Sequence, residues 1–163
     1  DGMDRMDFVK SKMAMILLLS LGSTILVFLT GLLTGLIYTD EIRDGQMFNG
    51  VEFVFAYFLD LTAYLTFAFL LTVVLKRSAL TIFLLLMYRL LELIVIGNLP
   101  SSLEFMADYF PLHSLSTLIE IPFPRYWFQE IQDYLAFTPA MVVIVYIFVF
   151  MAAVYYKLKK SDL

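Results

Sequence analysis

The sequence contains no cysteine and a single histidine, His113, among its 163 residues. The absence of cysteine excludes disulfide frameworks, thiolate metal sites and cysteine nucleophiles. One histidine argues against a haem or zinc site within this chain. The sequence also lacks a glycine-rich loop ending in Gly-Lys-Ser or Gly-Lys-Thr, the pattern that binds nucleotide phosphates. It therefore predicts no metal and no cofactor for this chain.

No set of residues has the spacing of a catalytic site either. His113 lies between Asp108 and Ser114, but all three fall in one short segment and no nucleophile elbow surrounds the serine. We therefore expect no enzymatic activity and no catalytic residue in this chain.

Charged residues make up 16% of the chain and hydrophobic residues 61%, with a mean hydropathy of +0.86. The apolar surplus is gathered into runs long enough to cross about 30 Å of hydrocarbon as helices. Their length and their lack of period-two alternation favour helices over strands, since barrel strands would be about half as long and would alternate. The sequence predicts an all-α polytopic transmembrane bundle, a single transmembrane domain over residues 1–163. Its four spans are expected at about 13–38, 53–75, 79–96 and 137–156.

Basic residues predict the orientation of these spans. Eight of the eleven lysines and arginines lie before the first span, between the second and third, or after the fourth. Because loops rich in lysine and arginine stay in the cytoplasm, both termini are expected inside a cytoplasmic (inner) membrane. The acidic pI of about 4.8 argues against a nucleic-acid partner. The eight basic residues expected on the cytoplasmic side are Arg5, Lys10, Lys12, Lys76, Arg77, Lys157, Lys159 and Lys160.

The connection between the third and fourth spans, residues 97–136, is expected to form an external cap. Ser101 and Glu104 have the spacing of a helix-capping box, and Pro111 is expected to stop the helix that follows. A second short helix is expected after Pro122-Phe123-Pro124. Both helices are predicted to lie on the outer membrane surface or to cap the bundle.

Three ionisable residues fall inside the predicted spans: Asp60 in the second, and Arg89 and Glu92 in the third. Such groups usually face a partner or a water-filled cavity. Asp60 and Arg89 each lie roughly 12–14 Å from the outer ends of their helices. A pair between them is therefore possible, and Glu92, one turn from Arg89, could share it. The cluster is either a polar site in a transport pathway, a structural clamp that holds the hairpin of the second and third spans together, or a set of charges that pairs with a missing subunit.

The first span carries Gly31 and Gly35, four residues apart. Glycines at this spacing let another helix approach closely. The partner is either another helix of the bundle or a second copy at a dimer seam.

The two ends of the chain resemble the type-2 ATP-binding-cassette (ABC) exporter permeases. The opening stretch, residues 1–12, is similar to the cytoplasmic segment before the third transmembrane helix of that family. The ending, residues 155–163, resembles its C-terminus, where basic residues precede Asp-Leu. The turn at 75–79 and the stretches Asn98-Leu99-Pro100 and Ile121-Pro122-Phe123 resemble its tight cytoplasmic turn and its large outer connection.

This resemblance implies a role and partners. The chain would supply the third to sixth of six spans, without the first two, and would form the translocation pathway of a transporter. Its partners would be a cytoplasmic ATPase subunit that hydrolyses ATP, a second permease in a homo- or heterodimer, and the lipid bilayer. Residues 1–12 would be the segment that couples to the ATPase, through Gly2, Met3, Arg5, Phe8 and Lys12. The alternative is a non-catalytic structural or accessory transmembrane subunit of a larger membrane complex.

Overall fold

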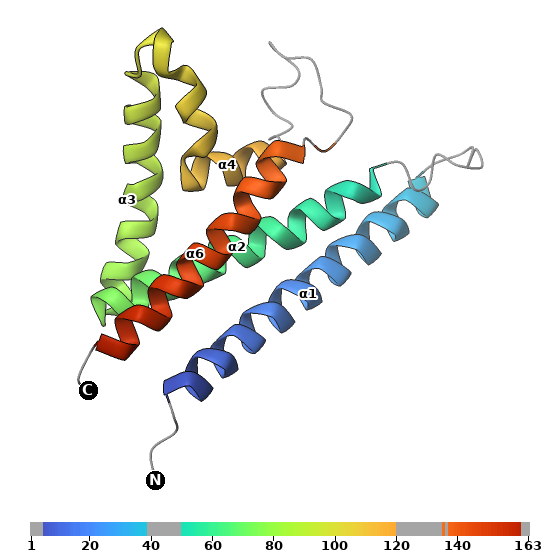
Figure 1. The fold of residues 1–163 in the computed structure, drawn as a ribbon. Coiled ribbons are helices and arrows are strands. Elements are labelled where there is room, and N and C mark those ends of the chain that lie inside the picture. The colour runs from blue at the N-terminus through green and yellow to red at the C-terminus, as the bar shows by residue number, and fades with distance from the viewer. Residues whose placement is uncertain (1–4, 39–49, 120–134, 136, 161–163) are drawn as a thin grey trace.

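The computed structural model describes residues 5–38, 50–119, 135 and 137–160, and within these ranges it contains helices and no strand. Figure 1 shows the arrangement of the elements. In chain order they are α1 (Arg5–Tyr38), α2 (Val51–Leu75), α3 (Ser78–Gly97), the 3₁₀ helix η1 (Ser101–Tyr109), α4 (Pro111–Leu118) and α6 (Phe137–Lys160). The all-helical prediction is confirmed.

Four of these helices, α1, α2, α3 and α6, are long and apolar enough to cross a membrane. Their ends agree with the predicted spans to within a few residues, except that α1 begins at Arg5. The last eight residues of the predicted coupling segment therefore continue the first span as one helix, because no proline or glycine interrupts them. The protein is a multi-pass membrane protein.

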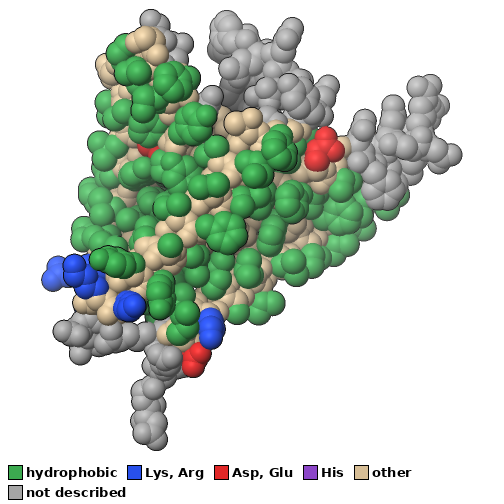
Figure 2. Space-filling model, viewed as in Figure 1, with side chains coloured by type: hydrophobic (Ala, Val, Ile, Leu, Met, Phe, Trp, Pro, Cys, Tyr) green, Lys and Arg blue, Asp and Glu red, His purple; other side chains and the backbone are tan. Residues whose placement is uncertain are grey.

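The beginning of α1 and the end of α6 lie at the same end of the bundle (Figure 1). Lysine and arginine side chains gather at this end, while the length of the helices is covered by hydrophobic side chains (Figure 2). We call it the basic end; the basic residues between α2 and α3 also belong to it. An even number of spans brings the beginning of the first helix and the end of the last to one side, as expected; that this side is the cytoplasm stays a prediction.

A tight turn connects α2 to α3 at the basic end, as expected from the sequence. Lys76 adopts a left-handed conformation, with φ of 54°, and its N–H donates to the carbonyl of Thr72 at 3.0 Å. This closes the last turn of α2 and lets α3 start at Ser78. From there α3 diverges from α2 toward the opposite end of the molecule (Figure 1).

The space left by this divergence is filled by α4. Beyond α3 the chain turns back through η1, and α4 packs against α2, α3 and α6 (Figure 1). Leu112, Leu115 and Leu118 are at most 6% exposed and join the main hydrophobic cluster, which α2 and α6 otherwise form. The segment after α3 is therefore re-entrant: it comes back into the bundle.

This placement corrects part of the expected external cap. As predicted, a short helix follows Pro100 and ends before Pro111. Pro111 then opens α4, a helix that the sequence pattern did not indicate. Proline suits the first turn of a helix because the N–H that it lacks has no partner there. The second expected helix, after Pro124, lies outside the described residues.

The orientation can be tested by labelling single cysteines, because the chain contains none. Ser78→Cys lies at the basic end and Ser102→Cys lies in η1 at the opposite end; both positions are exposed. In intact cells, a membrane-impermeant maleimide should label Ser102→Cys and leave Ser78→Cys unlabelled until the membrane is opened. The reverse pattern would invert the topology.

Candidate functional site: a charged cavity beside a re-entrant helix

The start of α4 is held by two charged side chains of α3. The backbone N–H of Leu112 donates to Oε1 of Glu92 at 3.0 Å. Nη1 of Arg89 donates to the carbonyl oxygen of the same leucine at 2.6 Å. Arg89 and Glu92, one turn apart on α3, thus bind both backbone groups of Leu112.

A third contact holds the same junction from the side of α6. The hydroxyl of Tyr146 donates to the carbonyl of Tyr109, the last residue of η1. The chain segment between η1 and α4 is therefore fixed by side chains from two different transmembrane helices.

These contacts follow from the depth of the junction. Arg89 and Glu92 lie about 8–12 Å below the end of α3, inside the predicted hydrocarbon region. Backbone groups there have no water to bind, so non-helical backbone is tolerated only where protein groups satisfy it. The first N–H groups of a helix have no partner within the helix, and a carboxylate suits the positive end of the helix dipole. Glu92 supplies that carboxylate to α4.

Glu92 is 4% exposed, and its second oxygen, Oε2, has no hydrogen-bond partner among the described residues. The phenol groups of Tyr88 and Tyr146 are close enough to interact with it. Tyr88 also packs on Phe67, whose ring in turn lies 5.0 Å from that of Phe150. Glu92 thus lies where α3, α4 and α6 meet, and α2 contacts this region through the ring of Tyr88.

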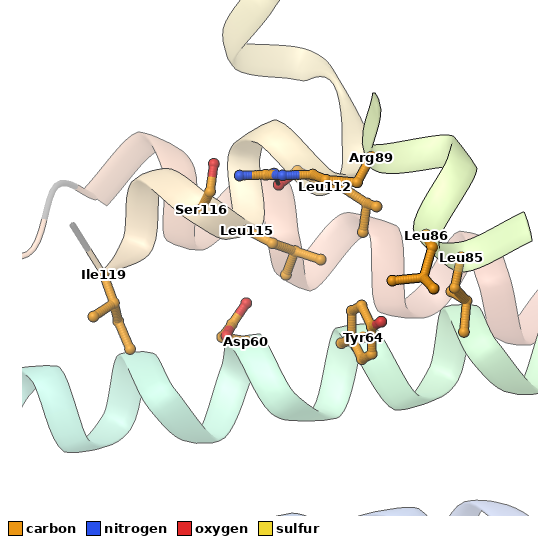
Figure 3. A pocket seen from close by; sticks show the side chains of 9 residues that line it. All are labelled: Asp60, Tyr64, Leu85, Leu86, Arg89, Leu112, Leu115, Ser116 and Ile119. Atoms are coloured by element: carbon orange, nitrogen blue, oxygen red, sulfur yellow. Dashed lines mark hydrogen bonds between the residues drawn. The ribbon is translucent and has the colours of Figure 1, made fainter. Parts of the chain in front are cut away.

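Beside this junction is a cavity of about 310 Å³. It is bounded by α2 on one side, by α4 on the other and by α3 at its end (Figure 3). Its polar side chains include Asp60, Arg89 and Ser116, and most of the remaining wall is apolar. The lining residues are Asp60, Tyr64, Leu85, Leu86, Arg89, Leu112, Leu115, Ser116 and Ile119.

Asp60 and Arg89 line this one cavity without forming an ion pair. Both are described, and no nitrogen of Arg89 lies within 4.0 Å of an Asp60 oxygen. The Arg89 side chain instead runs along α4, and Leu115 lies between it and Asp60 (Figure 3). The expected direct pair is therefore absent because α4 comes between the two helices. Arg89 and Glu92 lie close together on α3, as expected, and both bind the backbone of Leu112 in α4.

The other predicted site residues lie far from the cavity. Phe8 is at the basic end of α1, with its ring 6.3 Å from that of Phe69 in α2, and the amine of Lys12 lies 5.7 Å from the Phe8 ring centre. Arg5 is the first residue of α1. Gly2 and Met3 lie outside the described residues.

The glycine pair of α1 does not pack against the described part of the chain. A methyl group added at Gly31 or Gly35 would meet nothing within 4 Å outside its own helix. Of the two expected partners, a described helix of the bundle is therefore not the one that packs on these glycines. A second copy at a dimer seam stays a prediction. Within the described ranges, no three histidine or acidic residues are grouped as a metal site would require.

Comparison with known families places the whole chain in one of them. Residues 2–163 match the family model described as "Protein of unknown function (DUF2705)". The chain belongs to the DUF2705 family. No curated protein and no solved structure matches it.

The bond between Glu92 and Leu112 can be tested by mutation. Glu92→Ala leaves the buried N–H of Leu112 without a partner and should lower the free energy of unfolding by about 2 kcal/mol. Glu92→Gln retains a neutral acceptor and should lower it by less than about 1 kcal/mol. Denaturant titration in detergent, followed by circular dichroism, measures both.

The matched control is Glu52→Ala, which removes an exposed carboxylate from the first turn of α2. It should change the unfolding free energy by less than about 0.5 kcal/mol. If Glu92→Ala were no more destabilising than this control, the proposed support of α4 by Glu92 would be wrong.

Proposed function

We propose that this protein is a membrane-spanning permease subunit of an ATP-binding-cassette transporter, forming a translocation pathway driven by a partner ATPase. The observation that carries the proposal is the cavity among α2, α3 and α4, with Asp60 and Arg89 in its wall. Ionisable residues inside a membrane protein commonly mark substrate pathways.

The arrangement of the two charges supports a pathway. Charges that serve stability alone are expected to be in direct contact, because an unpaired charge in a low-dielectric region is unfavourable. Asp60 and Arg89 instead line a shared space. That space lies between α2 and α4 (Figure 3).

The energy source follows from the resemblance of residues 1–12 to the coupling segment of type-2 ABC exporters. The basic end of α1 presents Phe8 and Lys12, a compact aromatic and cationic contact that a cytoplasmic partner could bind. ATP would be hydrolysed by that partner, and a second permease would complete the transporter in the cytoplasmic (inner) membrane. The substrate would be lipid-like, peptide or drug-like.

One observation favours a second candidate, a non-catalytic accessory subunit of a larger membrane complex. Arg89 and Glu92 both bind the backbone of Leu112, which is a structural task. In such a subunit, the apolar surface of α1 would contact other transmembrane chains. Leu18 and Leu26 on that surface are 71% and 66% exposed.

Purification in mild detergent followed by mass spectrometry separates the two candidates. A permease should be recovered with an ATPase subunit that carries a phosphate-binding loop. Recovery with other membrane subunits and no ATPase, in a complex that hydrolyses no ATP, would support the accessory role and contradict the transporter.

The coupling segment can be tested by charge reversal. Arg5→Glu should abolish the stimulation of the partner's ATP hydrolysis and the transport, and leave assembly intact, because a contact with the ATPase would become repulsive. Lys157→Glu is the matched control: it reverses an exposed charge at the basic end, in α6, outside the coupling segment. Unchanged ATP hydrolysis and transport in Arg5→Glu would show that the coupling assignment is wrong.

A further inference from the structure

Of the three ionisable residues inside the predicted spans, Asp60 alone has no hydrogen bond or ion pair to a described residue. Arg89 is bonded through Nη1 to the Leu112 carbonyl, and its guanidinium has four further N–H groups. The wall of the cavity therefore carries a free acceptor on α2 and free donors on α3 that do not bond to each other.

We infer that this cavity binds an amphipathic zwitterion: a molecule with a protonated amine for Asp60, an anionic group for Arg89 and an apolar part. The inference rests on the proposed function in taking the cavity as the ligand site of the permease. It adds the chemical class of the ligand, which the fold and the family leave open.

The balance of charge in the wall favours a zwitterion over a simple ion. The two charged residues that line the cavity are of opposite sign, so the wall as a whole is neutral. An anion would pair with Arg89 and leave Asp60 beside a second negative charge. A cation would pair with Asp60 and leave Arg89 beside a second positive charge. A zwitterion satisfies both residues, which matters most where little water reaches the charges.

The remaining wall favours a ligand with an apolar part. Leu85, Leu86, Leu115 and Ile119 line the cavity, and Ser116 adds one hydroxyl, which donates to the carbonyl of His113 and keeps its lone pairs free to accept. The volume of about 310 Å³ is at the lower end of the range for small-molecule sites. Either the headgroup of an aminophospholipid or a small soluble zwitterion with an apolar side chain has this chemistry.

The test is calorimetric titration of the purified full chain, with any partners that accompany it, in a detergent without zwitterionic groups. The probes are dihexanoyl phosphatidylethanolamine for the lipid source and leucine for the soluble source. Dihexanoyl phosphatidylglycerol, which carries only the negative charge, and hexylamine, which carries only the positive charge, serve as ligand controls.

We expect saturable binding of at least one zwitterion, at least tenfold tighter than that of either single-charge probe. Binding of phosphatidylethanolamine alone identifies a lipid headgroup, and binding of leucine alone identifies a soluble ligand. Asp60→Asn should weaken binding about tenfold or more, because a charge-assisted hydrogen bond to the amine is lost. Ser116→Leu, which fills the cavity and removes no charge, should weaken it similarly. Glu52→Gln, which neutralises an exposed carboxylate in the first turn of α2, away from the cavity, should bind as the unmodified chain does.

Absence of saturable binding of both zwitterions to the unmodified chain would overturn the inference, as would equal affinity in Asp60→Asn. If Asp60→Asn fails to fold, two results still test the inference. One is the comparison of the four probes on the unmodified chain, and the other is the loss of binding in Ser116→Leu. The proposed function is tested by a different measurement, namely whether an ATPase subunit is recovered with the chain and whether its ATP hydrolysis is stimulated. Binding without an ATPase would refute the transporter and retain the site.

Discussion

The rest of the structure depends on satisfying the backbone where η1 meets α4. This junction lies within the thickness of the bundle, where a peptide group without a partner is strongly unfavourable. Glu92 accepts from the N–H of Leu112, Arg89 donates to its carbonyl, and Tyr146 donates to the carbonyl of Tyr109. These three bonds allow the chain to turn inside the bundle instead of at its surface.

The position of α4 then determines how the transmembrane helices are arranged. Since Leu112, Leu115 and Leu118 occupy the space between α2, α3 and α6, α3 meets α2 near the Lys76 turn and diverges from it beyond that point. The same helix keeps Arg89 away from Asp60. A structural requirement of the backbone thereby produces a cavity with two opposite charges in its wall. Support of the fold and binding of a ligand are compatible roles for Arg89, because one of its N–H groups serves the first and others are free for the second.

Much of the architecture could be predicted from the sequence. The four spans, their ends and the turn at Lys76 follow from the lengths of the apolar runs and the basic residues between them. The re-entry of α4 could not be predicted in this way. Pro111-Leu112-His113-Ser114 is short, mixed in polarity and far below the length of a span, so it resembles a surface segment. A signal was nonetheless present: leucines at 112, 115 and 118 share one helical face, and Arg89 and Glu92 in α3 needed polar partners.

The sequence by itself determined that this chain is a helical membrane protein with four spans, that its basic residues gather at one end, and that it carries three ionisable residues within the spans. These are local properties, set by hydropathy over about 20 residues and by the high energy of charge in lipid. Only the tertiary structure decided which partners those charges have. Partner choice depends on how helices far apart in the sequence pack together, and here the intervening helix α4 gives Arg89 and Glu92 the backbone of Leu112 and leaves Asp60 facing a cavity.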